Sequence, residues 1–250
     1  MKVLVCGKGG CGKSTVVALL SREMAKRKNK VLVVDSDESN IGLHHRLGMT
    51  KPADFMNYFG GKKILFEKTK EMTGKWKLDD LPKEYLSEKD NIQLLSMGKI
   101  YEFGEGCACP INALSSKFLE ILDLADKEFM IADTDAGIEH FGRGVEKGVD
   151  SLIVIIEPSQ DSILLAKKIS NLGKQLGKPT YLVLNRVNHE SEKLLLESID
   201  KEKVIATIPE NRDVFMAGLA GKELNISFEG IKQIADRLES EKRKVQAKLT

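Results

Sequence analysis

Short apolar runs rich in Val, Ile and Leu alternate along the chain with longer segments in which apolar residues recur every three or four positions. Apolar runs without strict alternation are typical of strands that are buried on both faces. Such strands are predicted at residues 2–6, 30–35, 91–97, 129–134, 151–158, 180–187 and 203–209. Helices are predicted between them, for example at residues 13–26, 111–126, 159–176 and 190–199.

This alternation predicts an α/β fold with a doubly wound, mainly parallel sheet and helices on both faces. A chain of 250 residues is long enough for one large domain of this kind, and we expect residues 1–250 to form it. Residues 50–90 are polar and lysine-rich with isolated aromatic residues, so they are expected to form an inserted surface subregion, a candidate for docking a client protein. At residues 228–249 we expect a charged helix without a wide apolar face.

Composition excludes several classes of partner. Lys and Arg number 39 and Asp and Glu 37, so no broad basic field attracts nucleic acid. No apolar run approaches the roughly 20 residues of a membrane helix, and the amino-terminal sequence has no signal-peptide pattern. Four cysteines without framework spacing suit a reducing compartment. We therefore expect a cytoplasmic protein without a membrane or nucleic-acid partner.

The strongest motif is GKGGCGKST at residues 7–15, between the first predicted strand and the first predicted helix. It fits G-x-x-x-x-G-K-[ST], a P-loop whose glycines let backbone N–H groups surround phosphates. Lys13 would contact the β- and γ-phosphates, and the Ser14 hydroxyl would ligate Mg²⁺. The expected cofactors are therefore ATP or ADP and Mg²⁺. The expected nucleotide-binding residues are Gly7, Lys8, Gly9, Gly10, Cys11, Gly12, Lys13, Ser14 and Thr15.

A second lysine, Lys8, makes the motif K-G-G-x-G-K-[ST], which resembles the deviant P-loop of the MinD/ParA/nitrogenase-iron-protein ATPases. The resemblance implies hydrolysis of ATP to ADP and phosphate by a homodimer. It also implies that Lys8 reaches the nucleotide of the partner subunit, so that ATP is held between two protomers.

Other positions of that family recur in the same order. By resemblance, Asp37 in VVDSDES positions the attacking water, and Asp35 lies nearer the magnesium shell. In IADTDAG, Asp133 is the acidic partner of magnesium, and Gly137 lets the second switch approach the γ-phosphate. Ordinary turns at strand ends are the alternative for these aspartates. The residues expected to act in catalysis are Lys8, Lys13, Asp37 and Asp133.

Two further segments resemble the adenine side of the family's site. Asn185 and Arg186 lie in LVLNRV, and Pro209 and Glu210 lie in IPEN. An asparagine amide both donates to and accepts from the edge of a base, which suits this role.

The stretch GEGCACP holds Cys107 and Cys109. Two thiols this close approach one ion from the same side, but a tetrahedral site needs four ligands. A two-fold dimer brings a second pair to the same place, so a metal ion shared between protomers is expected. Two incidental loop thiols are the alternative. His44 and His45 are either further ligands or polar surface residues.

KGGCGKST, CACP and DTDAGIEHFGRG (residues 133–144) together resemble the CooC-type maturation ATPases. The resemblance implies that the ion shared between protomers is Ni²⁺ or Zn²⁺. It also implies nickel insertion into carbon monoxide dehydrogenase, with the apo-enzyme as client. It assigns no chemistry to Glu139, His140 or Arg143. Maturation of another nickel enzyme such as acetyl-CoA synthase, an Fe–S reductase like the nitrogenase iron protein, and a MinD/ParA-type positioning ATPase are the alternatives.

Overall fold

The computed structural model describes residues 1–101, 107–135 and 145–247. Within these ranges eight strands form one sheet in the order β3-β4-β2-β5-β1-β6-β7-β8. The strands are β1 (Lys2–Gly7), β2 (Lys30–Asp35), β3 (Leu86–Lys89), β4 (Ile92–Ser96), β5 (Glu128–Asp133), β6 (Ser151–Ile156), β7 (Thr180–Val187) and β8 (Val204–Pro209). Neighbouring strands are parallel except β3 and β4, which confirms the predicted α/β class.

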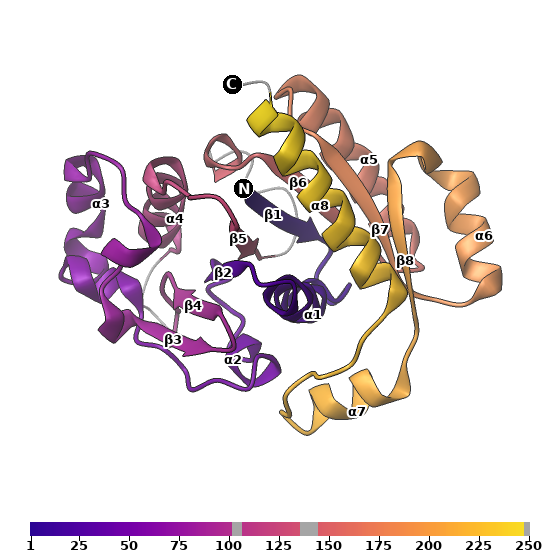
Figure 1. Cartoon of the computed structure of the whole chain (residues 1–250), viewed down its shortest axis with the longest axis horizontal. Coiled ribbons are helices and arrows are strands. Elements are labelled where there is room, and N and C mark those ends of the chain that lie inside the picture. Colours follow the sequence, from indigo (N-terminus) through magenta and orange to yellow (C-terminus); the bar gives the residue numbers. More distant parts are fainter. Residues whose placement is uncertain (102–106, 136–144, 248–250) are drawn as a thin grey trace.

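Helices cover both faces of the sheet (Figure 1). The α-helices are α1 (Lys13–Lys26), α2 (Leu43–Arg46), α3 (Lys62–Glu71), α4 (Cys109–Ile121), α5 (Gln160–Gln175), α6 (His189–Ser198), α7 (Arg212–Leu219) and α8 (Glu229–Ala247). In β1, Leu4 and Cys6 join the core under α4 and α5, whereas Val3 and Val5 join the core under α1 and α8. Because both faces are buried, the strand reads as an unbroken apolar run.

The topology gathers the predicted site at one edge of the sheet. From β1 the chain passes to β2 on one side, and it later builds β6, β7 and β8 on the other side. The carboxyl ends of parallel strands flanking such a reversal form the usual binding crevice of an open α/β sheet. Residues 7–15, Asp37 and Asp133 end or follow strands at this edge, and Asn185 lies two residues before the end of β7.

Residues 50–90 have more structure than their polar sequence predicts. They contain α3, the strand β3 and the short 3-10 helices η1 (Phe55–Phe59), η2 (Leu78–Asp80) and η3 (Lys83–Tyr85). The sequence analysis missed β3 because it is a four-residue edge strand with the mixed composition LSEK. The aromatic residues are not isolated: Phe55 is buried, and its ring lies near those of Tyr58, Phe59, Trp76, Tyr85 and Phe118.

Helix α4 differs from its predicted bounds, whereas α8 agrees with the charged helix predicted at residues 228–249. The helix predicted at residues 111–126 is α4 (Cys109–Ile121). It begins earlier than predicted because Pro110 suits the first turn of a helix, and it also ends earlier. The carboxyl-terminal helix α8 buries a narrow apolar stripe despite its many charges. The stripe consists of Ile231, Ile234, Ala235 and Leu238. Residues three and four apart lie on one helix face, so a narrow stripe is enough to pack α8 against α1 and β8.

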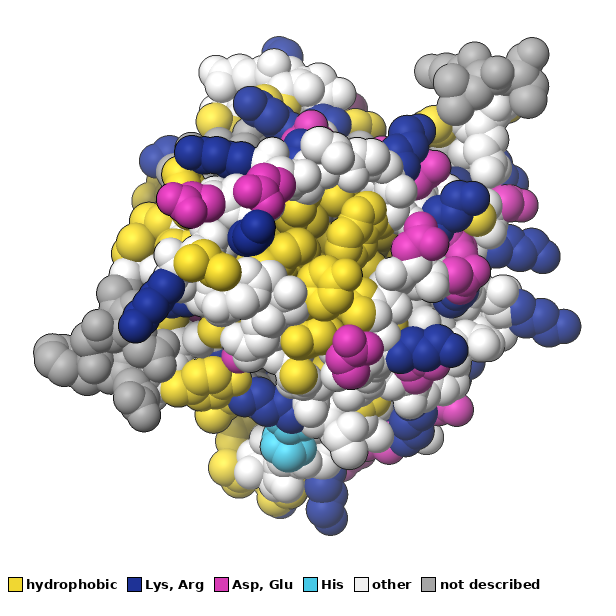
Figure 2. Space-filling view, turned by 90° about the vertical axis from the view of Figure 1, so that its left-hand side faces the viewer, with side chains coloured by type: hydrophobic (Ala, Val, Ile, Leu, Met, Phe, Trp, Pro, Cys, Tyr) yellow, Lys and Arg dark blue, Asp and Glu magenta, His cyan; other side chains and the backbone are white. Residues whose placement is uncertain are grey.

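The face that carries α3 and α4 shows apolar side chains gathered between charged ones (Figure 2). Tyr58, Ile64 and Phe66, from η1 and α3, are each between 42% and 53% exposed. Among the residues that the structure describes, no helix has both the length and the apolar content needed to cross a membrane.

Candidate functional site

Residues 7–15 are here called the glycine loop. Two of its glycines lie at positions where no side chain fits. Gly7 has a φ of +149°, and a Cβ atom on it would lie 2.6 Å from the carbonyl oxygen of Ile155. Gly12 has a φ of +97°, and its Cβ would lie 2.3 Å from Nδ2 of Asn185. Glycine is needed because L residues rarely adopt these φ values. The loop therefore carries the chain on a tight path from β1 into α1.

The end of β7 holds the glycine loop in place. Nδ2 of Asn185, a residue that is 4% exposed, donates to the carbonyl oxygen of Cys11 at 2.8 Å. Nη1 of Arg186 donates to the carbonyl oxygen of Gly10 at 2.7 Å. These bonds join β7, which lies between β6 and β8 in the sheet, to two successive residues of the loop backbone.

The two lysines of the glycine loop have different surroundings. Lys13 is 7% exposed, and its Nζ donates to the carbonyl oxygen of Lys8 at 3.4 Å. An ammonium has three N–H donors, so Lys13 retains capacity to bind an anion. Nζ of Lys8 lies 3.5 Å from a carboxylate oxygen of Glu157 and 3.7 Å from one of Asp161, which stands at the start of α5.

Asp133 ends β5 in a fully buried position next to Ser14. Burial raises the pKa of Asp133 to about 6, because desolvation penalises the charged form. Nδ2 of Asn40 donates to Oγ of Ser14 at 2.7 Å and to Oδ2 of Asp133 at 3.3 Å. The other carboxylate oxygen, Oδ1, is buried and has no hydrogen-bond partner within the described ranges. A hydroxyl beside an unpartnered carboxylate oxygen fits Mg²⁺, a hard cation that prefers oxygen ligands.

Asp35 and Asp37 belong to one turn at the end of β2. Asp37 is partly buried, and its Oδ1 accepts hydrogen bonds from Oγ of Ser39 at 2.6 Å and from the backbone N–H of Asn40 at 3.1 Å. Both carboxylate oxygens of Asp35 are engaged by the protein: Oδ1 accepts from the backbone N–H of Asp37, and Oδ2 lies 2.7 Å from Nζ of Lys99. Burial raises the pKa of Asp35 to about 7, since desolvation outweighs the attraction of Lys99.

Lys99 is a site residue that the sequence analysis missed. It is 2% exposed and follows β4, the neighbour of β2 in the sheet. A signal was present, because LLSMGKI places one lysine directly after a predicted buried strand, at the edge where Asp35 was expected.

A pocket of about 480 Å³ lies beside the start of α1. The four residues predicted for the adenine side, Asn185, Arg186, Pro209 and Glu210, all line it. The remaining lining residues include Thr15, Val16, Leu19, Val214, Phe215 and Leu219. A mostly apolar cavity with a few polar groups suits the flat, partly apolar face of a base.

The predicted thiol pair stands at the amino end of α4. Cys107 and Cys109 are both exposed, in contrast to Cys6 and Cys11, which are buried. The pKa of Cys107 lies below its usual range, chiefly because of a hydrogen bond with Cys109. Burial raises the pKa of Cys6 to about 12 and that of Cys11 to about 11. The reactive thiolates of the chain are therefore expected at the exposed pair.

The remaining residues named from the sequence gain no role from the described part of the structure. Gly137, Glu139, His140 and Arg143 lie outside the described residues. His44 and His45 form part of α2, with ring centroids 3.9 Å apart. Within residues 1–101, 107–135 and 145–247, no group of three or more His, Cys, Asp or Glu side chains is placed to hold a metal ion.

The fold and the glycine loop together define a P-loop nucleotide-binding protein. Residues 2–224 match the model of the CobQ/CobB/MinD/ParA nucleotide binding domain, and the chain belongs to this family. Members of the family are ATPases, so the protein is an ATPase.

Individual relatives agree with this assignment. An ATP-binding protein of Methanocaldococcus jannaschii is 51% identical over 95% of this chain and 99% of its own length. The carbon monoxide dehydrogenase accessory protein CooC of Rhodospirillum rubrum is 32% identical over 88% of each chain. The structure of MinD from Pyrococcus horikoshii with Mg-ADP has a TM-score of 0.66 and covers 95% of each chain at 18% identity, which shows a shared fold.

Proposed function

We propose that the protein is a dimerising ATPase that binds a nickel or zinc ion at the interface of two copies. It assists nickel insertion into carbon monoxide dehydrogenase. The observation that carries the proposal is the exposed pair Cys107 and Cys109 at the start of α4, in a chain 32% identical to a CooC protein. The metal ion is cargo in this account, and the apo-dehydrogenase is the client.

The glycine loop is proposed to bind the phosphates of ATP. Lys13 would neutralise charge on the β- and γ-phosphates, while the amino end of α1 favours the anion. Ser14 and Asp133 would hold Mg²⁺, which when bound offsets negative charge on the phosphates. The base would occupy the pocket lined by Asn185 and Pro209.

Asp37 is proposed to orient the attacking water. Its Oδ1 atom accepts hydrogen bonds from its own turn, so the carboxylate has a fixed direction at the edge of the site. Asp35 is proposed to act indirectly, because both of its carboxylate oxygens are already occupied by Lys99 and the backbone of Asp37. Its role is to hold the turn that carries Asp37.

Lys8 is proposed to reach the nucleotide of the second copy. In the single chain it contacts Glu157 and Asp161, and its side chain is 36% exposed. Ion pairs this exposed contribute about 1 kcal/mol or less, because water screens them. A charge-assisted hydrogen bond to a phosphate is stronger, so ATP in a paired copy would draw Lys8 away.

The thiols supply half of a tetrahedral set in each copy. The hydrogen bond with Cys109 lowers the pKa of Cys107, and a helix amino terminus also favours negative charge, so Cys107 is suited to bind metal as a thiolate. Two copies related by a two-fold axis would bring four thiolates around one ion. Since thiolates are the ligands, metal binding should release protons.

Metal content measured per chain tests the proposal. The wild type with a non-hydrolysable ATP analogue is expected to bind one nickel or zinc ion per two chains. Cys107→Ala is expected to lose that ion while it still binds Mg-ADP. Cys6→Ala is the matched control, because it removes a buried thiol and should keep the ion. One tightly held ion per single chain, or a visible Fe–S absorption after anaerobic purification, would contradict the proposal.

A further inference from the structure

Lys99 makes buried contacts to both aspartates of the turn after β2. Its Nζ lies 2.7 Å from Oδ2 of Asp35, and it donates to the backbone carbonyl oxygen of Asp37. The side chains of Lys99 and Asp35 are only 2% and 7% exposed. A buried ammonium is strongly unfavourable without such partners, so this lysine is fixed to the turn rather than free to swing into solvent.

The backbone on either side of Lys99 is bound to the same turn. The N–H of Met97 donates to the carbonyl oxygen of Asp35 at 3.0 Å, and the N–H of Ile100 donates to that of Glu38 at 3.2 Å. Residues 97–100 therefore lie alongside residues 35–38 and are held at three successive points. A displacement of Asp37 must either move residues 97–100 or break these bonds.

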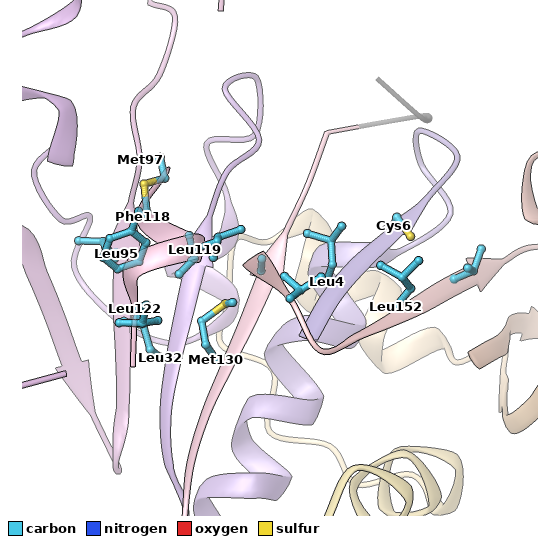
Figure 3. Packing of buried hydrophobic residues seen from close by; sticks show 14 of the residues in the cluster. Leu4, Cys6, Leu32, Leu95, Met97, Phe118, Leu119, Leu122, Met130 and Leu152 are labelled. Carbon is cyan, nitrogen blue, oxygen red and sulfur yellow. The ribbon is translucent and has the colours of Figure 1, made fainter. Parts of the chain in front are cut away.

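Residues 97–100 also contact the helix that carries the thiols. A Cβ atom on Gly98 would lie 3.3 Å from Cδ1 of Ile111, so the two residues are in close contact. Ile111 stands in the first turn of α4, two residues after Cys109. Met97 belongs to the same buried cluster as Ile111 and Phe118 of α4 (Figure 3). Close-packed contacts of this kind transmit displacement because buried side chains have little free volume.

We propose that Lys99 is a positioning residue that couples the turn at Asp37 to the thiol pair at the start of α4. When ATP or ADP changes the position of Asp37, Lys99 moves residues 97–100, and Gly98 and Met97 move the first turn of α4. The significance of the thiols rests on the proposed function, whereas the coupling itself is a property of contacts within one chain. Lys99 touches neither the glycine loop nor the thiols directly in the described structure.

Thiol reactivity measures this coupling without any metal. In reduced, metal-free protein, an aromatic disulfide reagent reports the rate at which exposed thiolates attack it. Cys6 and Cys11 are buried, so the fast phase belongs to Cys107 and Cys109. The rate is measured with Mg-ADP and with a non-hydrolysable ATP analogue, at a protein concentration low enough that the chain stays single, because pairing would itself cover the thiols. In the wild type the two rates are expected to differ by about fivefold or more, the lower range of measured couplings between sites.

Lys99→Met is expected to bring the ratio of the two rates close to one while Mg-ADP still binds. Lys30→Met is the matched control, because it removes a lysine paired with exposed Asp79, and it should keep the wild-type ratio. If the single variant does not fold, Asp35→Asn with Lys99→Met removes both charges of the buried pair, which is often tolerated. That double variant should also show a ratio near one.

Equal rates with the two nucleotides in the wild type would overturn the coupling, and so would a wild-type ratio in the folded Lys99 variants. Loss of Mg-ADP binding in the single variant Lys99→Met would also overturn it. These outcomes are independent of the metal test. If the chain binds no shared ion but the rate ratio depends on Lys99, the coupling stands and the proposed function fails. If the shared ion is found and Lys99→Met keeps the ratio, only the coupling fails.

Discussion

At the scale of single residues, the site contains carboxylates that are buried away from water. Asp133 is fully buried at the end of β5, and Oδ1 has no hydrogen-bond partner in the described part of the chain. A raised pKa in the folded state means that the folded protein binds a proton more tightly than the unfolded chain does. The charged form of Asp133 therefore destabilises the folded state, and a cation bound beside it would offset that cost.

This gives a pH-dependent prediction for Asp133→Asn in the absence of Mg²⁺ and nucleotide. The pKa is 3.8 in the unfolded chain and about 6 in the fold, so the ionised group destabilises the wild type increasingly as pH rises from about 4 to about 7. The stability of the variant relative to the wild type should rise over that window by about 3 kcal/mol, from 1.36 kcal/mol per pKa unit. Urea unfolding at several pH values measures this difference. A difference that does not vary with pH would contradict the account.

At the scale of elements, the glycine loop and the end of β7 form one unit. Gly12 has a φ of +97°, and any Cβ on it would strike Nδ2 of Asn185, which itself holds the carbonyl oxygen of Cys11. Part of the destabilisation caused by a side chain at position 12 is thus a collision with the side-chain amide of Asn185. The rest is backbone strain of about 1–2 kcal/mol.

A double-mutant cycle separates the two parts. Gly12→Ala and Asn185→Ala are each expected to destabilise the protein, the latter by about 1 kcal/mol for the lost hydrogen bond. The double variant should be more stable than the sum of the two effects predicts, by about 0.5–3 kcal/mol, because the collision is absent once the amide is removed. Thermal or urea unfolding of the four proteins gives the coupling energy. Strict additivity would show that Asn185 does not limit the residue at position 12.

The sequence predicts the elements that repeat a strong pattern and misses those that do not. The strands buried on both faces and the helices α1, α5 and α6 are predicted by the pattern of apolar residues. Burial requires apolar residues in these elements whatever their place in the sheet. β3 and α7 were missed, since one is a short polar edge strand and the other has no buried residue. The place of Lys99 just after a predicted strand was a local signal, but its contact with Asp35 depends on β2 and β4 being neighbours, which is set by topology.

At the scale of the whole molecule, the account depends on two copies coming together. The glycine loop and the thiols lie in separate parts of one chain, at the start of α1 and at the start of α4. Lys8 would supply a contact that each copy makes to the nucleotide of the other. A ligand selective for the paired state shifts the equilibrium by about 2.7 kcal/mol at a hundred times its dissociation constant, which is about a hundredfold in population.

Native mass spectrometry of the protein with Mg²⁺, nickel and a non-hydrolysable ATP analogue tests this central claim most directly, since it weighs chains, nucleotides and metal together. We expect a species of two chains, two nucleotides and one nickel ion for the wild type, and a single chain with one nucleotide for Lys8→Ala. A wild-type protein that stays single with nucleotide bound, or a Lys8→Ala protein that pairs as readily as the wild type, would contradict the account.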